Sequence, residues 1–179
     1  MFCVQRIEYG ANLSFSPDFS ENSVYVLFDP GNFEQKHRNF MNVLKSSNRC
    51  SLFADLPEDE YKSLRPMLFA INSHQQWEDL IRVLKEQIPL EQFRSFMFIE
   101  SSITDIYELQ KHIKHYLTGR LKNGRIALVR LYDPIVFLRL QNIWPEDGIQ
   151  EFWRPFLAWH IWDDIENTAI TFRKDINNA

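Results

Sequence analysis

The sequence predicts an α/β fold, with a sheet of about five strands flanked by helices and a small aromatic-rich C-terminal lobe or hairpin. Three observations predict this architecture. Short apolar runs typical of buried strands alternate with segments whose apolar residues recur at helical spacing. Capping and turn signals separate these segments. Tryptophan and phenylalanine residues crowd the chain after residue 145.

Composition and pattern divide the chain into an N-terminal strand and loop segment (1–22), an α/β core (23–144) and a C-terminal aromatic lobe (145–179). The chain has 179 residues, of which 45% are apolar, which is enough to bury a core. Its two cysteines, Cys3 and Cys50, are too few for a disulfide scaffold, which favours a reduced, cytoplasmic protein. No run approaches the roughly 20 apolar residues of a membrane span, so no membrane association is expected.

The first half of the core is expected to hold three strands and two helices, joined by an acidic helical turn. Asp29-Pro30-Gly31-Asn32 can turn the chain and start a helix, and Ser73 with Gln76 forms a capping box. The expected elements are, in order, a strand over 24–28, a helix over 33–44, a short strand over 51–53, a helical turn over 57–64, a strand over 67–71 and a helix to about residue 86.

The second half of the core repeats the alternation of strand and helix. A strand over 96–99 leads to a second capping signal, Ser102 with Asp105, and the helix that follows carries one apolar stripe. Gly119 and Asn123-Gly124 mark the turn into the next strand. A helix then runs from Pro134 to about residue 143, and 144–148 is expected to be a loop.

A strand-to-helix switch is predicted at residues 126–134. Its apolar run suits a buried strand, Asp133 can cap a helix, and Pro134 is tolerated at the first helical position. Strand ends in α/β folds line crevices where ligands and partners bind, so Arg130 and Tyr132 are candidates for function. In the structural alternative, Asp133 only caps, Arg130 pairs with a carboxylate and Tyr132 packs.

A stretch rich in basic residues precedes the switch. Between Leu109 and Tyr132 the chain has no acidic residue and six basic ones: Lys111, Lys114, Arg120, Lys122, Arg125 and Arg130. In a chain of net charge -4, such a patch would steer an acidic partner segment, whereas the alternative is a solvated helix face and polar turn. Arg139, on the helix that follows, would join Arg130 in donating paired hydrogen bonds to a partner's carboxylates. Nucleic acid is not expected as a partner, because the chain is acidic overall.

The aromatic tail admits two interpretations. Residues 155–163 alternate bulky side chains on both faces of a strand. A strand buried on both faces explains this pattern without any partner. At a sheet edge, the same strand would instead present Trp159, together with the nearby Trp153, as a docking strip for a partner.

Signals for chemistry are weak. The sequence has no glycine-rich phosphate loop, nucleophile elbow or metalloprotease histidine pair. His112 and His115 share a helix but lack a neighbouring cysteine or acidic ligand. We therefore assign no catalytic residue, metal or cofactor.

Several of these pieces, taken in order, resemble a known family. They are Leu27-Phe28-Asp29, Ser51-Leu52-Phe53 with its acidic turn, the strand 66–71, the helix 109–117, Arg130-Leu131-Tyr132-Asp133-Pro134, and the segment around Phe152-Trp153-Arg154-Pro155 and Trp159. Together they resemble the domain-of-unknown-function family DUF4123 of type VI secretion adaptor chaperones. Two departures are Arg65, where glycine is usual, and Ile113-Lys114, where leucine-arginine is commoner.

The resemblance implies a non-enzymatic, cytoplasmic binder. Such a protein would hold the N-terminal or spike-tip segment of a type VI effector and pass it to the spike (VgrG-type) or spike-tip (PAAR-type) protein. Two alternatives stay open. One is an immunity protein that blocks a toxin, and the other is a small enzyme with a cleft assembled from Asp29, Asp133 and nearby basic groups.

Overall fold

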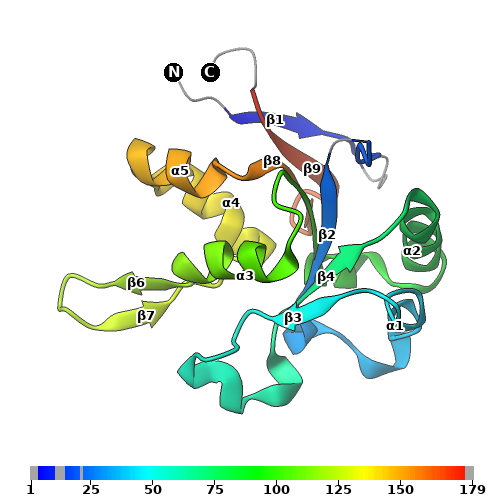
Figure 1. Cartoon of the computed structure of the whole chain (residues 1–179), viewed down its shortest axis with the longest axis horizontal. Helices are drawn as coiled ribbons and strands as arrows, with labels where there is room; N and C mark the ends of the chain where they lie inside the picture. Colours follow the sequence, from blue (N-terminus) through cyan, green and yellow to red (C-terminus); the bar gives the residue numbers. More distant parts are fainter. Residues whose placement is uncertain (1–3, 11–14, 21, 176–179) are drawn as a thin grey trace.

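A seven-stranded sheet is the centre of the fold in the computed structural model, which describes residues 4–10, 15–20 and 22–175 (Figure 1). Its strand order is β1-β9-β8-β5-β2-β4-β3, and every neighbouring pair is antiparallel. The strands are β1 (Val4–Glu8), β2 (Ser23–Phe28), β3 (Arg49–Ser51), β4 (Met67–Ile71), β5 (Phe96–Ser101), β8 (Phe156–Asp163) and β9 (Thr168–Lys174). The predicted α/β class is confirmed, with seven strands in the sheet instead of about five.

Helices cover both faces of the sheet. On one side lie α3 (Ile106–His115), α4 (Pro134–Ile143) and α5 (Glu146–Trp153), and on the other lie α1 (Phe40–Val43) and α2 (His74–Gln87) (Figure 1). Short 3-10 turns complete the fold: η1 (Pro30–Asn32), η2 (Gln35–His37), η3 (Pro57–Glu60), η4 (Lys62–Leu64) and η5 (Leu90–Ser95). Alternate residues of β2 point into the two cores, since Tyr25 packs with the α3 side and Val26 with the α2 side.

Capping signals in the sequence locate two helix starts correctly. The Ser73 hydroxyl accepts the Gln76 amide at 3.2 Å, and the Asp105 carboxylate accepts the Tyr107 amide at 2.8 Å. These bonds satisfy amides that the first turn of each helix leaves without an internal partner.

The continuous helix predicted over 33–44 is wrong, because this segment breaks into η2 and α1. Phe33 and Phe40 pack against each other and against Phe28, with the Phe33 and Phe40 ring centroids 5.2 Å apart. Seven residues of continuous helix would separate their Cα atoms by about 10 Å, which would draw the two rings apart. Tertiary packing of the rings therefore overrides the local helical pattern.

The region after residue 144 also differs from prediction. Residues 146–148, expected in a loop, begin helix α5, in which the Ile149 amide donates to the Pro145 carbonyl at 3.0 Å. The tail forms the predicted hairpin, β8 with β9, but this hairpin belongs to the main sheet and not to a separate lobe. Strand β8 is buried on both faces, with Trp159 in one core and Trp162 in the other.

The expected N-terminal strand is present as β1, which pairs with β9 at the sheet edge. Residues 1–3, 11–14 and 21 of the segment 1–22, including Cys3, lie outside the described residues. Cys50 is a buried free thiol, and burial raises its pKa to about 12. Among the helices of the described chain, none has the length and apolar character needed to cross a membrane.

Candidate partner-binding surface

A two-stranded hairpin, β6 (Thr118–Arg120) with β7 (Ile126–Leu128), projects from the body of the protein beside α3 (Figure 1). The turn predicted around Asn123-Gly124 is confirmed, and Gly124 adopts a φ of 80°, which favours glycine. The buried strand predicted over 126–129 is wrong, because Ile126 is 73% exposed. The partner strand Thr118-Gly119-Arg120 offers no apolar side chain to cover Ile126, whereas Leu128 and Val129 are partly buried against the core.

At the corner after β7, the local predictions hold. The Asp133 carboxylate accepts the Ile135 amide at 3.0 Å, and Pro134 occupies the first turn of α4. Tyr132 is buried and its ring packs against Phe53 at 5.7 Å between centroids. Burial raises the pKa of the Tyr132 phenol. Asp133 and Tyr132 therefore serve the fold first.

Arg130 provides the counter-charge for a buried carboxylate. Its Nη2 lies 3.6 Å from the Asp29 carboxylate and 3.6 Å from that of Asp133, and its guanidinium lies 5.6 Å from the centre of the Tyr132 ring. Asp29 is only 5% exposed, and burial raises the pKa of its carboxyl group, although the Gly31 amide and Arg130 oppose the rise. The Arg130 side chain remains 46% exposed, so a partner can still reach it.

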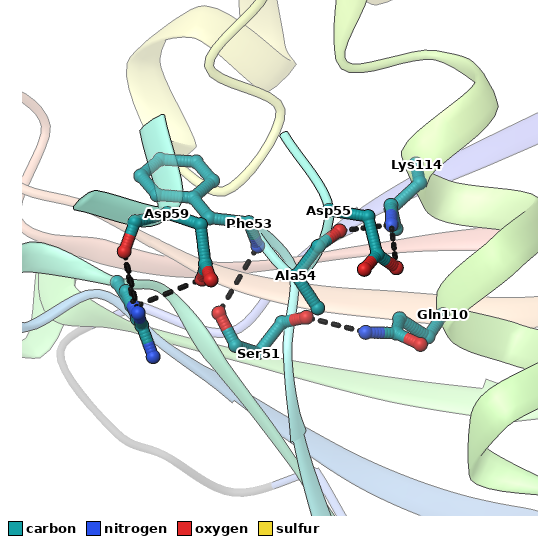
Figure 2. A network of polar contacts seen from close by, with 8 residues as sticks. Ser51, Phe53, Ala54, Asp55, Asp59, Gln110 and Lys114 are labelled. Carbon is teal, nitrogen blue, oxygen red and sulfur yellow. Dashed lines mark hydrogen bonds and ion pairs between the residues drawn. The ribbon is translucent and has the colours of Figure 1, made fainter. Parts of the chain in front are cut away.

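Lys114 anchors the loop after β3 (Figure 2). Its ammonium group donates to the Ala54 carbonyl and lies 3.6 Å from the Asp55 carboxylate. The side-chain amide of Gln110 donates to the Ser51 carbonyl in the same loop. Four residues apart on α3, Lys114 and Gln110 share one face and therefore reach the same loop. With 19% of its side chain exposed, Lys114 is mainly a structural anchor and not a free contact for a partner.

Between Leu109 and Tyr132, four other basic side chains are exposed and form no ion pair with any described residue. We call them the basic surface: Lys111 on α3, and Arg120, Lys122 and Arg125 on the hairpin. Two exposed apolar side chains lie among them, Leu121 at 51% and Ile126 at 73% exposure. The sequence indicates this basic surface through the absence of acidic residues in the stretch. It does not indicate that the residues project from the body on a hairpin.

Arg139 lies away from this surface. It is exposed on α4 and lines a cleft of about 560 Å³ together with Arg6 of β1, Asn142 and Glu166. Arg130 is not among the residues that line this cleft. The two arginines expected to act together on a partner's carboxylates therefore do not share this cleft.

Trp153 and Trp159 are both fully buried. The Trp153 indole donates to the Gln141 side chain at 3.0 Å, and the Trp159 ring stacks on Phe137 at 4.5 Å. The proposed docking strip is wrong, because β8 lies inside the sheet between β5 and β9 and not at an edge. These aromatic residues build the core beneath α4 and α5.

The order of these elements also matches a known family. A family model described as a domain of unknown function (DUF4123) matches residues 24–151. The chain belongs to the DUF4123 family. The match runs from β2 into α5, so it includes the Arg130 corner, α3 and the hairpin. Neither the search of curated proteins nor that of solved structures gives a significant match.

Beyond the predicted residues, the DUF4123 chain contains a buried polar cluster. His160 Nε2 lies 2.9 Å from Glu100, His160 Nδ1 lies 2.7 Å from the Thr171 hydroxyl, and Arg173 lies 2.9 Å from the same Glu100 oxygen. Burial lowers the pKa of His160. A neutral imidazole fits both contacts, since Nε2–H donates to Glu100 and Nδ1 accepts from Thr171.

This cluster ties three strands of the DUF4123 sheet together, because Glu100 is on β5, His160 on β8 and Thr171 on β9. All three residues are at most 1% exposed, and Phe15 stacks on the His160 ring at 4.2 Å. Hydrogen bonds that link a threonine to a histidine and the histidine to a glutamate suggest a nucleophile relay. However, the Thr171 hydroxyl is buried within the sheet, where a substrate could not reach it. The signal that sequence reasoning missed is a polar residue in the middle of an otherwise apolar strand.

The enzyme alternative named Asp29 and Asp133, and the DUF4123 fold does bring both beside one guanidinium. Each carboxylate already has a local role, since Asp29 accepts the Gly31 amide at 2.9 Å and Asp133 accepts the Ile135 amide. Within the described parts of the chain, no three His, Cys, Asp or Glu residues are grouped to hold a metal ion.

Proposed function

We propose that this protein is a non-enzymatic, cytoplasmic adaptor chaperone that binds a type VI secretion effector and helps load it onto the secretion spike. The resemblance of its motifs to the adaptor chaperones supplies the biological setting. The observation that carries the proposal is the basic surface, where unpaired cations and exposed apolar side chains lie together on a projecting element. The effector's N-terminal or spike-tip segment is the ligand proposed for it.

Charge supports a protein partner of acidic character. The chain has 24 acidic and 20 basic residues, yet the stretch from Leu109 to Tyr132 is free of acidic residues. A local positive field on an acidic protein speeds encounter with an acidic segment and disfavours basic partners. Leu121 and Ile126 add apolar area that water would otherwise cover. Arg130, half exposed at the base of the hairpin, extends the same field.

Co-expression with a candidate type VI effector tests the proposal. We expect a stable complex that survives gel filtration, and we expect deletion of the effector's N-terminal segment to abolish it. Removal of the toxic domain should leave the complex intact. Binding that requires the toxic domain, and not the N-terminal segment, would favour the immunity-protein alternative and overturn the adaptor proposal.

A further inference from the structure

The β6–β7 hairpin stands alone as a sheet. The Leu121 amide donates to the Arg125 carbonyl at 2.8 Å at the tip, and the Val129 amide donates to the Leu117 carbonyl at 2.6 Å at the base. Between them, Gly119 and Ala127 oppose each other in the register. Because hydrogen-bonded and non-hydrogen-bonded pairs alternate along an antiparallel ladder, this central pair is the hydrogen-bonded one.

In the two flanking pairs, the backbone N–H and C=O groups therefore point away from the partner strand, toward the outer edges of the hairpin. Among the described residues, no backbone hydrogen bond from another element reaches these groups. Each strand of the hairpin thus has an open edge that can accept a further strand. The outward residues are Thr118 and Arg120 on β6, and Ile126 and Leu128 on β7.

Side chains decide which strand can pair there. Arg120 and Ile126 oppose each other on one face of the hairpin, and Leu121 and Arg125 do so on the other. Each face thus combines one cation with one exposed apolar side chain. A second copy of the hairpin would bring like charges together, which opposes self-pairing. An incoming strand whose acidic residues alternate with apolar ones would meet opposite charge and apolar area together.

We infer that the β6–β7 hairpin binds an extended acidic segment of the partner by adding it as a third strand. Backbone hydrogen bonds to one open edge would supply affinity, and the arginines would select acidic residues. The inference rests on the proposed function only for the identity of the protein that carries the segment. The hairpin chemistry itself follows from the exposed edges and the charges.

Synthetic peptides test the inference with the full-length protein. The probe is a fluorescent peptide of about ten residues in which glutamate and valine alternate, longer than the strands it would pair with. A lysine–valine peptide of the same length reverses the charge. A third peptide keeps the glutamates but carries an N-methyl group on every backbone amide, which removes the donors of both edges.

We expect only the unmodified glutamate–valine peptide to bind, and to bind more weakly as salt rises from about 50 to about 200 mM. The triple variant Arg120→Glu, Lys122→Glu, Arg125→Glu should weaken binding by about tenfold or more. The matched control, Lys45→Glu, Lys62→Glu, Lys85→Glu, makes the same change of net charge at exposed lysines outside the hairpin and should stay within about twofold. The inference is overturned if the three peptides bind equally well, or if the two triple variants bind the glutamate–valine peptide equally well.

Amide hydrogen exchange on the wild-type protein gives an independent readout. Binding of the glutamate–valine peptide should slow exchange at the outward amides of one strand, either Thr118 and Arg120 or Ile126 and Leu128. The Gly119 and Ala127 amides already face each other and should change little. Binding without protection at either edge would show contact through side chains alone and would overturn the strand-addition mode.

Co-expression with the effector distinguishes the adaptor proposal from the strand-addition inference. If the effector co-purifies and the triple variant binds it as well as wild type does, the inference falls and the adaptor function stands. If the peptides bind as expected but no effector co-purifies, the hairpin chemistry stands and the adaptor function falls. Thermal unfolding of both triple variants checks that each remains folded.

Discussion

The Glu100 carboxylate lies 2.9 Å from His160 Nε2 inside the sheet, and neither residue is more than 1% exposed. Burial raises the pKa of Glu100, but the His160 hydrogen bond and the Arg173 charge outweigh it and hold that pKa below its ordinary value. Burial lowers the pKa of His160. This buried, hydrogen-bonded pair stabilises the fold only while Glu100 is ionised and His160 is neutral.

Acid should therefore destabilise the protein through His160. Its folded-state pKa is below the unfolded value of about 6.5, so the unfolded chain binds the proton more readily. The stability contribution is complete above about pH 6.5 and is lost as the pH falls towards the folded-state pKa. Glu100 acts in the same direction at lower pH, because its folded-state pKa is also lowered. Urea unfolding at pH 7.5 and 5.5 measures the difference.

His160→Gln supplies the comparison for this prediction. The variant should be less stable at pH 7.5 by about 1–3 kcal/mol, because Glu100 and Thr171 lose a fitted partner. It should also lose the part of the pH dependence between 7.5 and 5.5 that His160 contributes, and keep the part due to His112, whose pKa burial also lowers. His74→Gln, at an exposed position on α2, should keep the wild-type dependence. If His160→Gln and wild type show the same pH dependence, the assigned protonation state is wrong.

Removal of Arg130 should matter more at neutral than at acidic pH. The pKa of Asp29 is raised by burial, so its ionised form costs stability as the pH rises through the folded-state pKa, and Arg130 offsets that cost. Because Arg130 is half exposed, we expect Arg130→Ala to lower the free energy of unfolding by only about 1 kcal/mol at pH 7, and by less at pH 4. Urea unfolding at both pH values measures this.

A double variant tests whether Arg130 stabilises the fold through the buried charge of Asp29. Asp29→Asn removes the buried charge while its side-chain oxygen can still accept the Gly31 amide. Asp29→Asn with Arg130→Ala should therefore be more stable at pH 7 than Arg130→Ala alone. An equal loss in the single and double variants would mean that Arg130 does not stabilise through Asp29.

Local signals in the sequence were read correctly wherever a side chain acts on its own backbone. Ser73 and Asp133 cap helices as expected, and Asp105 caps α3 in place of Ser102, since a cap requires only residues within three positions of each other. The apolar pattern also located β2, β4, β5 and β8, whereas the strand expected over 51–53 lies at Arg49–Ser51 and the range of β9 was not predicted. These features depend on short-range chemistry that the sequence carries directly.

Features that depend on distant partners were not readable in the same way. An apolar run such as 126–129 suits a buried strand or an exposed hairpin equally, and only its neighbour β6 decides between them. The aromatic tail likewise reads as core or as interface until β8 is placed between β5 and β9. For the candidate site, sequence located the basic stretch but could not separate anchored Lys114 from free Lys111.

Truncation of Trp153 should act through stability and not through a binding surface. The side chain is fully buried among Phe137, Phe152 and Phe156. Trp153→Ala should lower the free energy of unfolding by about 3–5 kcal/mol, and Trp153→Phe by clearly less. Chemical denaturation measures both. A folded Trp153→Ala protein of wild-type stability that fails to bind the effector would restore Trp153 as a contact.

Lys111 and Lys114 should separate partner binding from folding, because they lie three residues apart on α3 with different surroundings. Lys114 contacts Ala54 and Asp55, whereas Lys111 is exposed and makes no ion pair with any described residue. Lys114→Met should lower the free energy of unfolding by about 1 kcal/mol and speed amide exchange in the loop after β3. Lys111→Met, which removes the same charge, should leave stability unchanged and weaken effector binding. Denaturation, amide exchange and calorimetric titration of the co-expressed effector measure the three effects, and a loss of stability in Lys111→Met would contradict its assignment to the basic surface.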